Sequence, residues 1–122
     1  MELKWKQSIR IPDGNHVGEI KKIENRIEPY EYTDIMIKLD DVDDIEMKYG
    51  CPTVLSENSK LGRLMQLFGA SIEVGKKLNI DNFLIGKRVK CVTITKKNRK
   101  SGKEFSEIVE DSLKPEVEIQ KV

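Results

Sequence analysis

Apolar and polar side chains alternate most regularly between Tyr32 and Asp40. The positions on the apolar side of this segment are Thr33, Ile35, Ile37 and Leu39. A period of two predicts a β-strand with one buried face. A second alternation follows an acidic connection at residues 40–46, and its apolar positions are Ile45, Met47, Tyr49 and Cys51. We therefore predict two strands joined by an acidic turn.

The segment from His16 to Ile27 has a less regular pattern, with apolar residues at Val17, Ile20, Ile23 and Ile27. We predict a strand with a bulge near Lys21 and Lys22, which would place three of these residues, all but Ile20, on one face. Gly18 permits the sharp curvature that a closed barrel requires. A helix is the alternative. It is less favoured because turn residues lie on both sides of the segment.

Apolar residues recur at helical spacing after residue 60, at Leu61, Leu64, Met65 and Phe68. This spacing predicts an amphipathic helix with a buried stripe. Residues 56–59, Ser-Glu-Asn-Ser, are a source of N-cap oxygens, and Gly69 ends the segment. Gly62 costs about 1 kcal/mol relative to alanine inside a helix, which indicates close contact between the helix backbone and a neighbour. We expect residues 70–83 to form a loop.

Two runs rich in Val, Ile and Thr lie between Leu84 and Val109, and the turn residues Asn98, Ser101 and Gly102 separate them. This pattern predicts a long β-hairpin. Between Gly86 and Lys103 there are eight cations and no acid, namely Lys87, Arg88, Lys90, Lys96, Lys97, Arg99, Lys100 and Lys103. Because the net charge of the whole chain is only +1, this local concentration would steer an anionic partner to one side of the molecule. The alternative is a loop whose lysines only keep the hairpin end soluble.

The predicted order of three strands, one helix and two strands is that of an OB-fold. We expect an all-β domain with one helix, in which a five-stranded Greek-key barrel has its helix between strands three and four. The domain would span residues 1–122, with its core at about 11–113. Leu3 and Trp5 alternate in a short N-terminal strand, and a tail opened by Pro115 is a candidate to lie beside it and bury Trp5.

Oligonucleotides bind an OB-fold across strands two and three, between the first-to-second and fourth-to-fifth loops. The basic hairpin tip would form the second of those loops. The first loop and its surroundings contribute Arg26, Tyr30, Tyr32 and Lys38, and Phe105 lies beside the basic tip. Rings that stack on bases, interleaved with cations that follow phosphates, are typical of single-strand binding with weak sequence preference. The eight cations and these five residues form the candidate interface.

The remaining chemistry of the sequence argues against an enzyme or a metalloprotein. Cys51 and Cys91 are far apart, so we expect reduced, buried thiols rather than a zinc site or a disulfide. His16 is the one histidine and is expected to be a surface or packing residue, since no nucleophile and base can be identified together. The acidic turn lacks the glycine and terminal glutamate of a calcium loop. We expect no catalytic residue, no metal, no cofactor and no membrane span, and a cytoplasmic location, in the host cytoplasm if a phage encodes the chain.

Four short motifs resemble those of phage-type and archaeal small single-stranded DNA-binding proteins of the OB class. They are Ile-Pro-Asp-Gly at 11–14 running into Val-Gly-Glu-Ile at 17–20, the helix at 59–69, Leu-Ile-Gly-Lys-Arg-Val at 84–89, and Gly-Lys-Glu-Phe at 102–105. The resemblance implies a protein that coats single-stranded DNA in replication, recombination or repair, as a homo-oligomer and alongside replication or recombination proteins. Two alternatives stay open. One is an RNA-binding OB module, and the other is an assembly domain in which the hairpin pairs with the acidic turn of a neighbouring copy.

Overall fold

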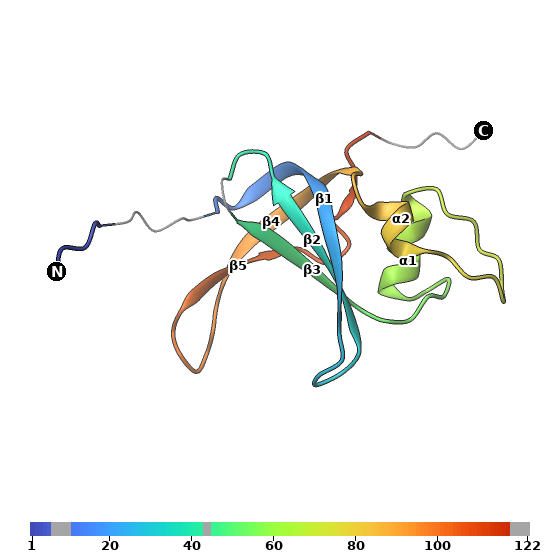
Figure 1. Cartoon of the computed structure of the whole chain (residues 1–122), viewed down its shortest axis with the longest axis horizontal. Helices are drawn as coiled ribbons and strands as arrows, with labels where there is room; N and C mark the ends of the chain where they lie inside the picture. The colour runs from blue at the N-terminus through green and yellow to red at the C-terminus, as the bar shows by residue number, and fades with distance from the viewer. Residues whose placement is uncertain (6–10, 43–44, 118–122) are drawn as a thin grey trace.

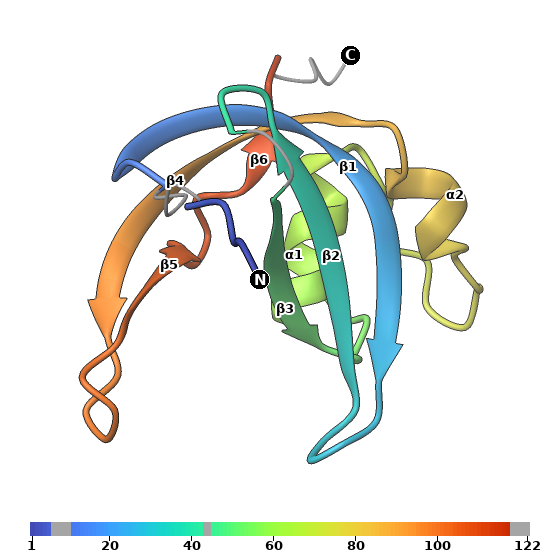
Figure 2. The same cartoon turned by 60° about the vertical axis from the view of Figure 1, so that its left-hand side comes forward.

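The computed structural model describes residues 1–5, 11–42 and 45–117, and within them the chain is mostly β (Figure 1). The elements in chain order are β1 (Gly14–Arg26), β2 (Tyr32–Leu39), β3 (Glu46–Pro52), α1 (Lys60–Leu67), α2 (Ile80–Leu84), β4 (Arg88–Lys97), β5 (Glu104–Ile108) and β6 (Lys114–Pro115). The six strands form one antiparallel sheet in the order β3-β2-β1-β4-β5, and β6 pairs with β4. The sheet is strongly curved, with β3 and β5 as its two ends (Figure 2).

The strand β1 contains the expected bulge, but it presents a different face to the core. The register with β2 shifts between Ile20 and Lys22. The extra residue moves the inward positions from even to odd numbers, so that Ile20 and then Ile23 face the core. Val17 and Ile27 are 37% and 72% exposed, and the prediction that they lie on the buried face is therefore wrong.

The alternation of β2 and β3 is confirmed. The inward side chains of β2 are buried at Thr33, Ile35, Ile37 and Leu39, and those of β3 are buried at Met47, Tyr49 and Cys51. Cross-strand pairs such as Ile35 with Tyr49 and Ile37 with Met47 join the two rows. Burial of these side chains is the main favourable contribution of this half of the sheet to folding.

Helix α1 begins where the sequence predicts and packs against β3 and β6. The Ser59 hydroxyl accepts a hydrogen bond from the Gly62 amide at 2.9 Å, and Leu61, Leu64 and Met65 are buried. A Cβ on Gly62 would lie 1.7 Å from the Ser56 carbonyl oxygen, so this glycine does permit the close backbone contact that was predicted.

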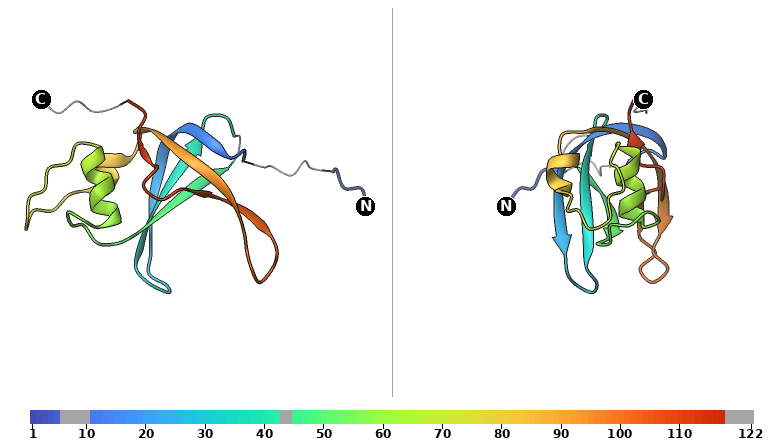
Figure 3. Two further views of the ribbon diagram at one scale, coloured as in Figure 1. Left: turned by 180° about the vertical axis from the view of Figure 1, so that it is seen from behind. Right: turned by 90° about the vertical axis from the view of Figure 1, so that its right-hand side faces the viewer.

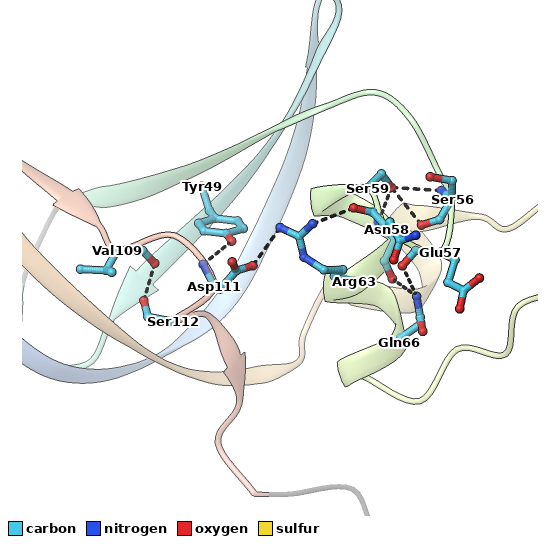
Figure 4. A network of polar contacts seen from close by, with 11 residues as sticks. Tyr49, Ser56, Glu57, Asn58, Ser59, Arg63, Gln66, Val109, Asp111 and Ser112 are labelled. Carbon is cyan, nitrogen blue, oxygen red and sulfur yellow. Dashed lines mark hydrogen bonds and ion pairs between the residues drawn. The ribbon is translucent and has the colours of Figure 1, made fainter.

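Polar contacts connect α1 to the sheet (Figure 4). The Arg63 guanidinium donates to the Asn58 carbonyl at 2.7 Å and to the Asp111 carboxylate at 3.1 Å. The Asp111 amide donates in turn to the hydroxyl of Tyr49 on β3 at 3.2 Å. The helix is thereby fixed at one end of the curved sheet, on the side away from the N-terminus (Figure 3).

Two predictions about the remaining segments are wrong. Residues 70–83 are not a loop throughout, because a second helix, α2, begins at Ile80 after an Asn79 cap, whose side chain accepts from the Asn82 amide at 3.1 Å. Five residues are too few to give a periodic stripe, so the sequence pattern did not predict this helix. Trp5 is 98% exposed rather than packed in the core, and residues 1–5 form no strand. Residues 6–10 and 118–122, where further pairing was expected, lie outside the described part of the chain.

Candidate nucleic-acid interface

Two turns extend from the same side of the curved sheet, the β1–β2 turn at residues 27–31 and the β4–β5 turn at 98–103 (Figures 1 and 2). They are the two loops to which the sequence assigned the tyrosines and the basic tip. The curvature of the sheet accounts for this placement, because β1 bends like an arch, with β4 paired to its first half and β2 to its second half (Figure 2). Strand β1 ends at the first turn, and β4, which runs in the opposite direction, continues past the start of β1 to the second turn.

A groove of about 620 Å³ lies between β3 and β5. Tyr32 lines it beside the first turn, and Phe105 lines it on β5 next to the second turn. Its charged lining residues are Glu46, Lys48, Lys60, Glu107 and Glu110. The groove therefore combines aromatic surface with charges of both signs.

The tip of the β4–β5 hairpin is an ordered turn built around Asn98. The Asn98 side-chain oxygen accepts from the amides of Lys100 at 2.9 Å and Ser101 at 3.3 Å, and the Asn98 carbonyl accepts from the Gly102 amide at 2.8 Å. Gly102 has a φ of 71°, which favours glycine at this position. The turn holds Arg99 and Lys100 in solvent.

Most cations of the tip are available to an anion. Lys96 forms an ion pair with Glu107 at 2.6 Å. Within residues 1–5, 11–42 and 45–117, no carboxylate lies at ion-pair distance from Lys97, Arg99, Lys100 or Lys103. These four side chains give the tip a net positive charge even with Glu104 opposite Lys97 in the register, and this charge attracts phosphates at low salt.

Compared with known proteins, this sequence matches no protein-family model and no curated protein.

The other predicted cations lie elsewhere. Lys87, Arg88 and Lys90 are at the opposite end of β4, roughly 20 Å or more from Lys96 at about 3.3 Å per residue. Arg88 forms hydrogen-bonded ion pairs with Asp40 and Glu116, and both contacts raise the pKa of Arg88. The hydrogen bonds from Arg88 lower the pKa of Asp40.

Three of the predicted lysines lie away from the hairpin tip. Lys87 lies 5.9 Å from the centre of the Phe83 ring. Lys90 pairs in register with Lys114 on β6. Lys38 is on the outward face of β2, between Glu19 and Glu46 in the register of the sheet. The predicted basic set thus divides into a tip group and a remote group.

Around the first turn, Tyr30 is 74% exposed and Tyr32 is partly buried. The Arg26 guanidinium lies 4.8 Å from the centre of the Tyr32 ring and forms an ion pair with Asp34 at 3.1 Å. Arg26 therefore already has partners within the chain, in contrast to the tip cations.

Lys48 and Lys60 line the groove but were not predicted from the sequence. Lys48 stands at an outward position of β3, so the alternation of that strand was a usable signal. Lys60 begins α1, and its ammonium lies 4.3 Å from the centre of the Tyr49 ring. No local pattern indicates that contact, because it depends on how α1 docks on β3.

A second hollow, of about 430 Å³, contains His16 and Asp41 near the start of β1. His16 is buried; its Nδ1 lies 3.0 Å from both Asp41 carboxylate oxygens, and its Nε2 lies 2.6 Å from the Pro12 carbonyl. Since both ring nitrogens face acceptors, the ring suits the doubly protonated form. Burial lowers the pKa of His16, but the bonds to Pro12 and Asp41 outweigh it and the pKa is raised.

The cysteines and acidic residues give no sign of further chemistry in the described residues. Cys51 and Cys91 are free and buried, and burial raises the pKa of each to about 11, so both thiols stay protonated near neutral pH. No cluster of three or more metal-ligating side chains occurs among the residues that the structure describes; residues 43 and 44 of the acidic turn lie outside them. In the same part of the chain, neither helix has the length and apolar character of a bilayer-spanning segment.

Proposed function

We propose that this protein binds single-stranded DNA without catalysis and with little sequence preference. The observation that carries the proposal is the position of the basic tip and the tyrosine-bearing turn on one side of the sheet, with the ring-lined groove between β3 and β5. A flexible polyanion with flat bases matches this combination of exposed cations and aromatic surface.

We further propose that the sheet is an OB-fold. The strand order β3-β2-β1-β4-β5 supports this proposal, as do the contacts between β3 and β5 at the two ends of the order. The position of α1 in the chain, between β3 and β4, also agrees with it. The OB assignment and the resemblance of the sequence motifs lead to the same role, coating of single strands in replication, recombination or repair.

In this proposal, phosphates and bases use different parts of the surface. Phosphates contact Lys97, Arg99, Lys100 and Lys103, the cations of the tip that have no ion-pair partner among the described residues. The charged lining of the groove has three carboxylates and two ammonium groups, so it does not concentrate positive charge and is better suited to uncharged bases than to phosphates. Stacking on Tyr32 and Phe105, and on the exposed Tyr30, accepts any base, which accounts for weak sequence preference.

Fluorescence anisotropy of a labelled thymidine oligomer, titrated at several salt concentrations, tests the proposal. We expect log affinity to fall with log salt by about 0.7 for each phosphate contact. The double variant Arg99→Glu/Lys100→Glu should bind at least tenfold more weakly, with a slope reduced by about 1.4. A matched control is Lys76→Glu/Lys77→Glu, the same charge change on the exposed loop between the helices, which should bind nearly as the wild type does.

The proposal fails if wild-type affinity does not depend on salt, or if the tip variant and the control lose equal affinity. The same titration with the matching RNA and with duplex DNA distinguishes an RNA-binding module from a DNA-binding one. The assembly alternative receives less support, because Asp40 and Asp41 of the acidic turn are already paired with Arg88 and His16. If it holds, the tip variant changes oligomer size while oligonucleotide titrations stay flat.

A further inference from the structure

Arg26, the last residue of β1, contacts two side chains of β2, those of Tyr32 and Asp34. Its register partner on β2 is Tyr32, and its guanidinium carbon lies 4.8 Å from the centre of that ring. Its Nε and Nη2 atoms donate to the two carboxylate oxygens of Asp34 at 3.1 Å and 3.3 Å. Such a two-pronged contact holds the planar guanidinium in one orientation.

Asp34 is an unusual anchor, because it stands on the outward side of β2 and yet is only 4% exposed. A buried carboxylate requires compensation, and Arg26 supplies it. The opposite residue on β3 is Gly50, where a Cβ would lie 3.1 Å from Asp34 Oδ1 and 3.6 Å from the Tyr32 ring. The absence of a side chain at this position leaves the space that the Arg26–Asp34 pair and the ring occupy.

Tyr32 differs from the other aromatic residues of the candidate interface because a cation lies over its ring. Within the described part of the chain, neither Tyr30 nor Phe105 has a cation over its ring. One face of Tyr32 is covered by Arg26, and the ring lines the groove between β3 and β5. A base can therefore stack on this ring only from its uncovered side, and the ring is already ordered before the ligand arrives. Ordering in advance lowers the entropic cost of binding.

We propose that Arg26 is a positioning residue and not a phosphate contact: anchored on Asp34, it holds Tyr32 in place so that the uncovered face of the ring stacks a base. The inference rests on the proposed binding of single-stranded DNA and names what one part of that site does. It reassigns a residue that the charge pattern alone would count among the phosphate contacts.

The decisive variant is Arg26→Lys, because it keeps the positive charge but loses the two-pronged bond and the flat surface. A phosphate contact survives this change, whereas a positioning role does not. We expect about a fivefold loss of affinity for a thymidine oligomer, the range of a cation over an aromatic ring. The salt slope should stay unchanged, and so should the affinity for an abasic oligomer of equal length. Tyr32→Leu should give the same pattern with a larger loss.

Arg88→Lys is the matched control, since Arg88 also forms a two-pronged contact with a carboxylate, that of Asp40, but lies in the remote group and has no ring partner among the described residues. It should bind both oligomers as the wild type does. If Arg26→Lys does not fold, as judged by circular dichroism, Asp34→Asn releases the same guanidinium with a side chain of equal shape and should give the same result.

Three results overturn the inference while leaving single-strand binding intact. They are wild-type affinity in Arg26→Lys, equal losses for thymidine and abasic oligomers, and a slope that falls by about 0.7 in Arg26→Gln. If the wild type binds neither oligomer, the proposed function itself has failed.

Discussion

At the scale of single residues, His16 makes the stability of the fold depend on pH. Its pKa is raised in the folded state above the usual value of about 6.5. The stabilisation by its ion pair with Asp41 is therefore complete below about pH 6.5 and is lost as pH rises through the folded-state pKa. We expect the wild type to lose on the order of 1 kcal/mol of unfolding free energy between pH 5.5 and 8.5. Urea denaturation at several pH values measures this change in unfolding free energy.

His16→Gln serves as the comparison, since it removes the one imidazole of the chain. Its unfolding free energy should be flat over the same interval. Parallel pH profiles for the variant and the wild type would show that folding does not raise the pKa of His16.

At the scale of elements, the clearest prediction concerns the start of α1. From helix propensity alone, Gly62→Ala would be expected to raise the free energy of unfolding by about 1 kcal/mol. The added Cβ would instead meet the Ser56 carbonyl oxygen at 1.7 Å, a main-chain atom that cannot move aside without shifting the capping turn. We expect net destabilisation of about 1–3 kcal/mol, as for overpacked interiors, measured by thermal or urea unfolding. A rise in stability would mean that the turn before α1 adjusts freely.

The elements also show how far sequence patterns extend. Strands β2 and β3 and helix α1 were predicted because each buries a periodic set of its own residues. In β1 the bulge was predicted but its buried face was not, since one inserted residue reverses the side of every later position. For α2, five residues with an Asn79 cap give no periodic signal at all.

At the scale of the whole molecule, the two groups of cations at opposite ends of β4 should differ in their effect on binding. We expect Lys90→Glu to change affinity for an oligomer of about four to eight nucleotides less than twofold, because this residue is roughly 20 Å from Lys96. Arg99→Glu should weaken binding about tenfold and reduce the salt slope by about 0.7. Anisotropy titrations with short oligomers separate the two. An equal effect of Lys90→Glu would indicate a longer path for the strand.

Residue patterns along the chain were enough to predict the succession of β1 to β5, the position of α1, the β4–β5 hairpin and the concentration of cations at residues 86–103. These features are local or periodic, so neighbouring residues suffice to predict them. The tertiary structure alone decided which cations are available, with Arg88 bound to Asp40 and Arg26 bound to Asp34. It also decided that Lys60 meets the groove and that both turns lie on one side of the sheet. The reason is physical: such contacts join residues far apart in the chain, and they depend on the register and curvature of the assembled sheet.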